Sequence, residues 1–316
     1  MSMKKIVAYI LVLLLAGIPV LTACSSGKDA SPQTEGGNQS TPEPIKIGAI
    51  FPLSGSLALL GTESFEAADL ARKMVNENGG VNGRHVEFVK ADAPDATAAA
   101  NEANRLITKE KVKMIIGTYS SGLSLAAIPV AERNEIPYLE LVAGSDKINQ
   151  QGFKYVFRSN ENATDLGSTA VDFAVEVLAP KLNIDKKDLK VAVIHEDGAF
   201  GVSVAEAVKK RADEIGLSLA AYDNYQASSV DLSSLVLKLK DLNPDIVIAT
   251  SYVNDAVLFI KQSKQYDFNP KAIIGTSAGY GLPDLADSLG GAVDGIFVTE
   301  APALVNSQGL SEEAKK

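Results

Sequence analysis

Apolar and polar positions follow two patterns along the chain, short apolar runs and longer amphipathic stretches. From Ile45, the run IKIGAIF is followed by a loop rich in serine and glycine. FEAADLARKMVNENGG then places apolar residues at helical spacing and ends in glycine. The same order returns from Leu189, where LKVAVIH precedes EDGAFG and VSVAEAVKKRADEIG. The pattern therefore predicts two copies of a unit made of a strand, a glycine loop and a helix.

The two copies continue in step after these first units. Strands alternate with helices of about ten residues or more, which indicates right-handed βαβ units and parallel sheets. We therefore expect an α/β protein with two doubly wound parallel-sheet lobes. The further elements predicted in the first copy are strands over 85–92, 113–121 and 136–145 and helices over 96–111 and 123–135; those in the second copy are strands over 217–225, 245–253 and 271–279 and helices over 231–243 and 254–268.

A binding cleft is expected where the two lobes face each other. Ligands of doubly wound sheets bind beyond the carboxyl ends of the strands, where helix N-termini present free N–H groups. Hydroxyl, small and aromatic residues occupy these positions, which favours hydrogen bonding and stacking around a small polar molecule. The positions are Ser54, Gly55, 118–122, 143–145, 195–200, 250–252 and 276–279.

Composition narrows the classes of function. The chain has 316 residues, enough for two domains, with 30 Lys and Arg against 39 Asp and Glu and a formal net charge of −9. This excess of acid opposes binding to nucleic acid. One cysteine and 2 histidines exclude an internal disulfide framework and a multi-histidine metal site. We expect no cofactor and no metal.

The N-terminal residues have the pattern of a targeting segment. Lys4 and Lys5 precede an apolar run over 6–23, and the only cysteine, Cys24, follows the small residues that end this run. This is typical of a secretory signal over 1–23. An uncleaved membrane anchor is the alternative, although the run barely reaches spanning length. Residues 24–44 are polar, with no apolar period, and predict a flexible tether. Leu-Thr-Ala-Cys resembles the lipobox of bacterial lipoproteins, which implies lipidation of Cys24 and a lipid anchor to a bacterial cell membrane.

The order of motifs resembles a known family. IKIGAIFPLSG, NENGGVNG, IIGTYSSGLSLA, IPYLELVAGS, GFKYVFRS, VAVIHEDGAFG and DIVIATSY together are similar to the type I extracytoplasmic solute-binding proteins of the Leu/Ile/Val-binding group. The resemblance covers about 45–303. It implies a periplasmic binding protein-like fold, a small amino-acid-like ligand, and presentation of the closed form to the membrane subunits of an ABC importer.

The resemblance also implies a division into lobes. The first lobe would comprise 45–158 and 299–316, and the second would comprise 159–298. Hinges are expected near 157–160 and 297–300, where the chain crosses between the lobes. The family continues beyond the length of this chain, so we expect part of the first lobe to be missing.

Family residues for the ligand carboxylate map onto the first lobe. The resemblance places a carboxylate-binding hydroxyl and amide at Ser121, and a carbonyl, hydroxyl and amide at Ala143 to Ser145. The alternative for both serines is an N-cap of the following helix, a common role for serine.

Family residues of the second lobe match less closely. The aromatic positions of the cleft fall on Phe200 and Tyr252, which ordinary packing would also explain. The family's ammonium-binding acid falls near Ser277, which is not an acid, so Glu140 is considered as a source of the carboxylate. A solvated polar role is the alternative for Ser277 and Glu140. His195 is interpreted as a structural residue.

Two other classes of function remain. Gly275 to Gly279 matches the G-x-S-x-G pattern of a serine hydrolase, but both histidines lie upstream, whereas a hydrolase of this kind has its histidine downstream. The chain has no phosphate-loop or dinucleotide-binding motif, so we expect that it is not an enzyme. A ligand sensor on the same fold, signalling to a receptor, stays open beside transport.

Overall fold

Two five-stranded parallel sheets form the framework of the protein in the computed structural model, which describes residues 42–300. The first sheet has the order β2-β1-β3-β4-β5 and the second has the order β10-β9-β8-β6-β7. The strands of the first sheet are β1 (Ile45–Phe51), β2 (Val86–Asp92), β3 (Ile115–Gly117), β4 (Tyr138–Glu140) and β5 (Val156–Arg158). Those of the second are β6 (Val191–Glu196), β7 (Leu219–Tyr225), β8 (Ile246–Thr250), β9 (Ala272–Thr276) and β10 (Ile296–Thr299).

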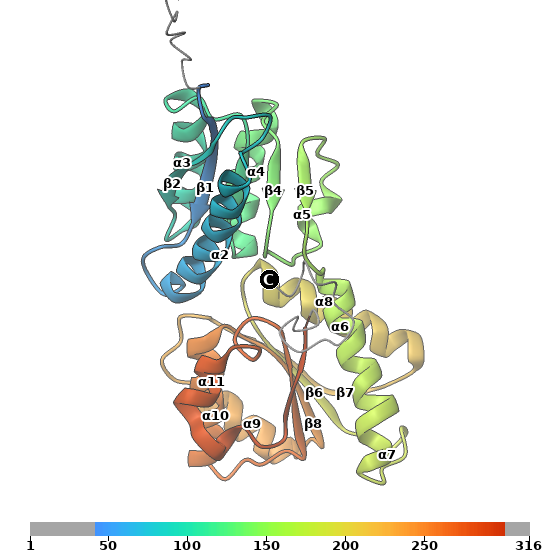
Figure 1. Ribbon diagram of the computed structural model, residues 1–316. Helices are drawn as coiled ribbons and strands as arrows, with labels where there is room; N and C mark the ends of the chain where they lie inside the picture. Colours follow the sequence, from blue (N-terminus) through green and yellow to red (C-terminus); the bar gives the residue numbers. More distant parts are fainter. Residues whose placement is uncertain (1–41, 301–316) are drawn as a thin grey trace, which may run out of the picture. The chain divides into compact units, whose positions relative to one another are not determined.

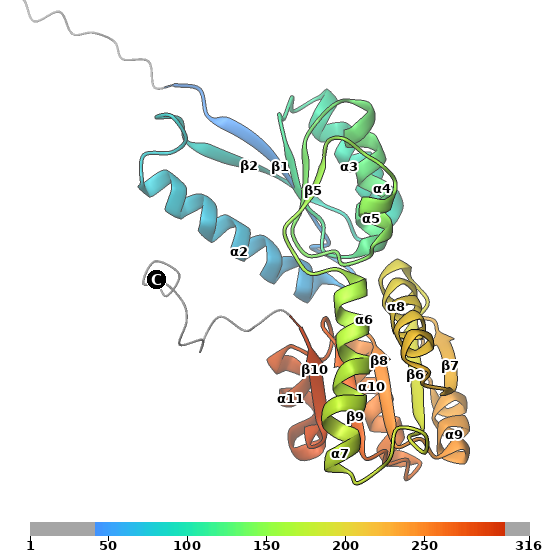
Figure 2. The ribbon, with the colours of Figure 1, turned by 90° about the vertical axis from the view of Figure 1, so that its right-hand side faces the viewer.

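Helices cover both faces of each sheet, as Figures 1 and 2 show. In the first lobe they are α2 (Ala58–Glu77), α3 (Ala96–Thr108), α4 (Ser121–Arg133) and the short α5 (Lys147–Gln150). In the second lobe they are α6 (Ala163–Asp172), continued by the π-helix η2 (Phe173–Leu178) and α7 (Ala179–Lys181), then α8 (Ala199–Ile215), α9 (Ser233–Leu242), α10 (Val253–Gln265), α11 (Pro283–Leu289) and the 3₁₀-helix η3 (Gly290–Val293).

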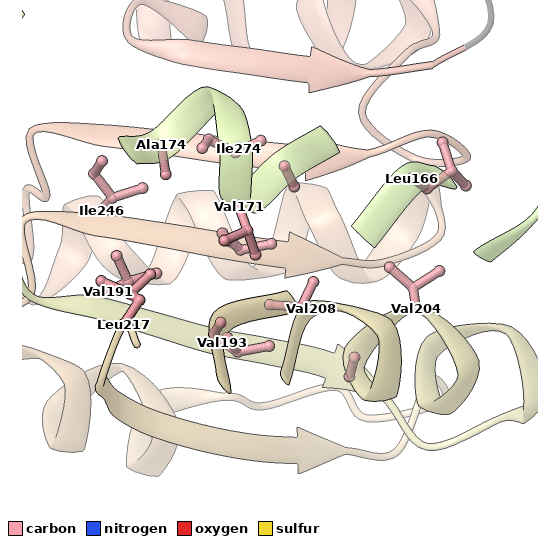
Figure 3. Packing of buried hydrophobic residues seen from close by; sticks show 14 of the residues in the cluster. Leu166, Val171, Ala174, Val191, Val193, Val204, Val208, Leu217, Ile246 and Ile274 are labelled. Atoms are coloured by element: carbon pink, nitrogen blue, oxygen red, sulfur yellow. The ribbon is translucent and has the colours of Figure 1, made fainter. Parts of the chain in front are cut away.

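Each sheet is buried on both faces, which explains why its central strands are continuous apolar runs. In the second lobe, β8 is buried along its whole length. One face packs against α6 and α8, where Val171, Val193 and Ile274 lie in one apolar cluster (Figure 3). The opposite face packs against α9, α10 and α11. This double cover holds the carboxyl ends of the strands, and the loops that leave them, in fixed positions.

The predicted fold class is confirmed, and the two copies read from the sequence form the two sheets. One helix begins earlier than predicted. The sequence pattern places its start at Phe65, whereas α2 begins at Ala58. Gly61, which favoured a loop, lies so close to the backbone of Pro52 that a Cβ would overlap it. The glycine therefore permits close packing of the helix on the end of β1.

The helix between the two copies was not predicted. It starts after Asn162, whose side-chain oxygen accepts a hydrogen bond from the Asp165 N–H at 2.8 Å. Its amide donates in return to the Asp165 carboxylate at 2.7 Å. This reciprocal cap is visible in the sequence as Asn-x-x-Asp.

Some predictions fall outside the described residues. They are the signal segment, Cys24, most of the tether and 301–316. Thr299 was predicted to start the return to the first lobe, but it belongs to β10 of the second sheet.

Candidate functional site

A small cavity lies between the loops of the two lobes at the carboxyl ends of their strands. We call it the cleft cavity. Its volume is about 30 Å³, which is room for one water molecule. Three of the predicted site residues, Phe200, Tyr252 and Ser277, are part of its wall. The remaining lining residues are Tyr119, Val142, Gly144, Glu161, Leu166 and Ala278.

Three aromatic side chains from three loops meet at this cavity. Tyr252 occupies the N-cap position of α10, Phe200 lies in the first turn of α8, and Tyr119 follows β3. The ring centre of Tyr252 lies 6.2 Å from that of Phe200 and 6.3 Å from that of Tyr119. Both pairs are tilted, with ring centres at the distance of interacting aromatic pairs. Because Tyr119 belongs to the first lobe and the other two to the second, the rings form a bridge between the lobes.

Two larger cavities adjoin the same lobe boundary. The first has a volume of about 240 Å³ and shares Tyr119, Val142, Glu161, Ser277 and Ala278 with the cleft cavity. The second has a volume of about 390 Å³ and shares Tyr252. We call them the hinge cavity and the outer cavity. The other residues that line the hinge cavity are Leu60, Glu63, Ser64, Leu141, Asn160, Leu282 and Glu300. Those that line the outer cavity are Ser56, Leu57, Asp197, Gln226, Ala227, Ser228, Asn254 and Asp255.

The loop after β9 places Ser277 beside the crossing between the lobes. Ser277 and Ala278 both have left-handed backbone conformations, with φ of 54° and 44°. The Ser277 N–H donates to the Thr299 carbonyl at 2.9 Å, and the Gly279 N–H donates to the Ser251 carbonyl at 3.0 Å. The Ser277 hydroxyl reaches the Glu161 carboxylate at 3.5 Å. Ser277 stands where the resemblance implies an acid, and Glu161, from another segment, places a carboxylate next to it.

The structure brings Ser121 and Ser145 together but leaves both outside the cavity linings. The Ser145 N–H donates to the Ser121 hydroxyl at 3.1 Å, and both residues are fully buried. The Ser145 hydroxyl has no hydrogen-bond partner among the described residues. The helix-cap alternative assigns them N-cap roles, but Ser120 occupies the N-cap of α4 and Asp146 that of α5. Their ligand role stays a prediction.

Glu140 lies at the end of β4 and holds the loops that follow β3 and β4. One carboxylate oxygen accepts the N–H groups of 141–143 at 2.9 to 3.1 Å. The other accepts the Thr118 N–H at 3.1 Å and a short hydrogen bond from the Ser124 hydroxyl. Burial raises the pKa of Glu140 to about 7, while these donors lower it. The side chain lines none of the three cavities, and Ala143, which the resemblance also assigned to the ligand, is one of its donors. This placement supports a loop-positioning role for Glu140, and its contact with a ligand stays a prediction.

A second buried carboxylate orders the loops of the other lobe. Asp255, in the first turn of α10, accepts a hydrogen bond from the Tyr225 hydroxyl at 2.7 Å. The same hydroxyl lies 2.6 Å from the Ser251 hydroxyl. Burial raises the pKa of Asp255 to about 7. Glu196, at the end of β6, accepts N–H groups of Gly198 and Gly201 at the start of α8.

His195 and Glu196 lack the arrangement of a catalytic pair. The His195 ring nitrogen Nδ1 lies 2.7 Å from the Glu196 carbonyl oxygen, and the ring packs edge-on against Tyr222. His195 is 2% exposed. Between residues 42 and 300, no group of His, Cys, Asp or Glu side chains is arranged to hold a metal ion. The site is therefore equipped for hydrogen bonding, stacking and charge recognition.

Four residues that line the cleft cavity were not singled out from the sequence: Tyr119, Val142, Glu161 and Leu166. Tyr119 belongs to the 118–122 segment but was not singled out, although it is the aromatic side chain of that segment. Glu161 lies in the polar stretch Ser-Asn-Glu-Asn directly after β5. A cluster of polar residues at the carboxyl end of a strand is a signal that could have found it.

Comparison with known proteins decides the family. A family model described as periplasmic binding protein matches residues 44–310. The chain belongs to this family. Members of this family are solute-binding proteins and not enzymes. Membership of the family implies an extracytoplasmic location. Within residues 42–300, no helix combines the length and hydropathy needed to cross a membrane.

Individual relatives agree with the predicted group. The chain is similar to Leu/Ile/Val-binding protein homolog 7 of Brucella suis biovar 1 (strain 1330), with 43% identity over 246 residues, 78% of this chain and 62% of the relative. The chain thus spans about three fifths of that protein's length. It is also similar to the crystal structure of a leucine binding protein from Thermotoga maritima MSB8, with a TM-score of 0.73, 27% identity and coverage of 84% and 72% of the two chains.

A third likeness shows the fold. The substrate binding protein of a branched-chain amino acid transporter from Streptococcus pneumoniae, solved in complex with isoleucine, matches with a TM-score of 0.71 and 24% identity. The match covers 81% of this chain and 70% of that one. The predicted family and its type I periplasmic binding protein fold are confirmed.

Proposed function

We propose that this protein is the substrate-binding component of an ABC uptake system and captures a small amino-acid-like solute between its lobes. The observation that carries this proposal is the cleft cavity, where Tyr119 and Gly144 of the first lobe face Phe200, Tyr252 and Ser277 of the second. The cavity as described has room for only one water molecule, so a solute enters when the lobes move apart, and once held between these residues it contacts both lobes at once. Its binding therefore favours the arrangement in which the lobes are close.

The ligand carboxylate is assigned to Ser121 and Ser145. The Ser145 hydroxyl is buried and lacks a partner among the described residues, and buried hydroxyls normally have one. Their neighbours Tyr119 and Gly144 line the cavity, so a small opening of this contact gives a ligand access. Each charge-assisted hydrogen bond to the carboxylate contributes about 1.5 to 3 kcal/mol.

Calorimetry of the full chain against a panel of amino acids tests the function. Ser121→Ala should weaken the tightest amino acid by about tenfold or more, since 1.4 kcal/mol is a factor of ten in affinity. Ser218→Ala, at an exposed position of the second lobe, is the control and should bind as the wild type does. An affinity within twofold of wild type for Ser121→Ala contradicts its assignment. Binding of no amino acid contradicts the function.

Closure is proposed to occur at the two crossings between the lobes. The first, 159–162, connects β5 to α6, and the second is predicted from the sequence near 297–300. The Thr299 hydroxyl donates to the Leu166 carbonyl at 3.3 Å, which joins the second crossing to the start of α6. Neighbouring crossings permit a hinge rotation with few backbone changes. Small-angle scattering of the full chain should give a smaller radius of gyration with saturating ligand, and an unchanged radius contradicts the hinge.

The anchor is proposed to be a lipid on Cys24, which lies outside the described residues. Support comes from the charged start, the apolar run and the small residues before Cys24. Cys24→Ala should release the protein from bacterial membranes or leave its precursor uncut. Normal processing together with unchanged membrane retention of the variant contradicts the anchor.

A further inference from the structure

The segment Gly275 to Gly279, whose sequence matches the G-x-S-x-G pattern, packs the loop after β9 against the loop after β8. A Cβ at Gly275 would overlap the ring of Tyr280. A Cβ at Gly279 would overlap the backbone of Tyr252, at the start of α10. The two glycines of the pattern therefore permit close contact between two loops that both reach the cleft cavity.

A chain of buried hydroxyl groups joins the same two loops. The Tyr280 hydroxyl lies 3.2 Å from the Ser251 hydroxyl, which lies 2.6 Å from the Tyr225 hydroxyl. Tyr225 donates to the Asp255 carboxylate at 2.7 Å. Because each hydroxyl has one hydrogen, Ser251 then donates to Tyr225 and accepts from Tyr280. All four residues are buried, so water competes little for these hydrogen bonds.

The loop after β9 depends on its surroundings because its backbone is strained. Ser277 and Ala278 both have left-handed conformations, which are unfavourable for residues other than glycine. Such conformations persist only where neighbouring contacts hold them. Both residues line the cleft cavity, so relaxation of this loop would change the surface that a solute meets.

We infer that Tyr280 is a positioning residue for solute binding, because its hydroxyl holds Ser277 and Ala278 in the conformation that forms the cavity wall. Tyr280 lines none of the three cavities and therefore acts through residues that do. The inference rests on the proposed function and adds a determinant of affinity that lies outside the site. Without this hydrogen bond, fewer molecules have the binding loop formed, and the apparent affinity falls with that fraction.

Tyr280→Phe tests the inference, since phenylalanine keeps the ring beside Gly275 and removes only the hydroxyl. Loss of one such hydrogen bond corresponds to a change of about two- to twelvefold in an equilibrium. In calorimetry of the full chain with its tightest amino acid, the variant should bind at least twofold more weakly than the wild type. Tyr266→Phe removes a hydroxyl at the opposite end of α10 and should bind as the wild type does.

Ser251→Ala tests the same hydrogen bond from its acceptor. This variant leaves Tyr280 intact and removes the hydroxyl that it donates to. It should also bind the tightest amino acid at least twofold more weakly. The measurement keeps the inference testable if either variant alone fails to fold, which the melting temperature shows.

A glycine in the strained loop separates positioning from a general effect on stability. Glycine adopts left-handed conformations without the strain that alanine has there, so Ala278→Gly supports the loop in another way. In the Ala278→Gly background, Tyr280→Phe should lower the affinity by less than twofold. The comparison within one background cancels the loss of the Ala278 methyl group from the cavity wall.

The outcomes separate this inference from the proposed function. An affinity of folded Tyr280→Phe within twofold of the wild type overturns the positioning role and leaves solute binding standing. An equal loss of affinity with and without Ala278→Gly overturns the strained loop as the route through which Tyr280 acts. Binding of no amino acid by the wild type overturns the proposed function and this inference together.

Discussion

Single buried carboxylates fix the backbone of the site. Glu140 accepts four backbone N–H groups, from Thr118 and 141–143, so one side chain connects the loops that carry Ser121 and Ser145. We therefore expect Glu140 to affect solute binding through the positions of these loops.

Glu140→Gln should destabilise the protein and weaken binding together. The amide places an N–H₂ group among backbone N–H donors, and each donor left unsatisfied costs about 1 to 3 kcal/mol. We expect a lower melting temperature and at least a tenfold loss of affinity for the tightest amino acid. Glu87→Gln, at an exposed position of β2, is the control. Wild-type melting and binding of Glu140→Gln would show that the carboxylate is dispensable.

The sequence predicted which residues lie near the cleft cavity better than it predicted what each of them does. Phe200, Tyr252 and Ser277 line the cleft cavity, as strand-end positions suggested. Glu140 also lies at a strand end, which indicated from the sequence that its side chain is near the cleft. The direction in which it points depends on the N–H groups of two loops, which no sequence pattern displays.

At the scale of elements, close packing of helix starts against strand ends sets the loop shapes. A Cβ at Gly201 would overlap the Glu196 carbonyl and approach its carboxylate oxygen to 2.8 Å. Gly122 also lies in a first helical turn, as the second residue of α4, where Gly201 is the third of α8, and a Cβ there would have its nearest contact at 3.8 Å. The two glycines form a matched pair.

Gly201→Ala should therefore destabilise the protein, whereas Gly122→Ala should not. Overpacking at Gly201 costs about 1 to 3 kcal/mol. At Gly122 the alanine gains up to about 1 kcal/mol from its higher helix propensity. Urea unfolding of both variants measures the difference. Equal free energies of unfolding for the two would refute the packing argument.

The start of α10 should make stability depend on pH. The pKa of Asp255 is raised from 3.8 to about 7, mainly by burial and further by the charge of Glu196. Between these values the folded protein keeps a proton that the unfolded chain has lost. The free energy of unfolding therefore falls as pH rises from about 4 to about 7, by at most about 1.4 kcal/mol per pH unit from this group.

Asp255→Asn should remove this contribution. Urea unfolding at pH 5 and pH 8 should show a smaller loss of stability for the variant than for the wild type. Asp241→Asn, at an exposed position of α9, should retain the wild-type difference. The explanation is wrong if Asp255→Asn keeps that difference as well.

The elements themselves were largely predictable, and the exceptions have physical reasons. Buried parallel strands and amphipathic helices repeat in both copies, so their order was visible. The start of α2 was missed because Gly61 signals a loop, whereas its missing side chain serves contact with Pro52. The region over 163–181 was missed because it lies between the copies and changes from α-helix to π-helix at Phe173.

At the scale of the whole molecule, a polar contact joins the two lobes in addition to the aromatic bridge. The Asp146 N–H donates to the Ser203 hydroxyl at 3.1 Å, from the start of α5 to α8. Ser203 is 4% exposed, so water competes little for this hydrogen bond. The contact should stabilise the close arrangement of the lobes more than either lobe alone.

Ser203→Ala should weaken solute binding with little effect on unfolding. Loss of one hydrogen bond of about 0.5 to 1.5 kcal/mol corresponds to an affinity about two- to twelvefold lower. Calorimetry with the tightest amino acid and urea unfolding measure both effects. Ser168→Ala, whose hydroxyl bonds only within α6, is the control. Unchanged affinity would show that this contact does not contribute to closure.

The hydrogen bonds from loop N–H groups to the Glu140 and Glu196 carboxylates affect how ligand specificity can evolve. They hold backbone N–H groups, so where there is room for a side chain the support does not involve that side chain. Val142 shows this arrangement, because its N–H bonds Glu140 while the residue lines the cleft cavity. A substitution there alters the surface offered to the solute and leaves the scaffold intact. New specificities can therefore arise by single substitutions without loss of the fold.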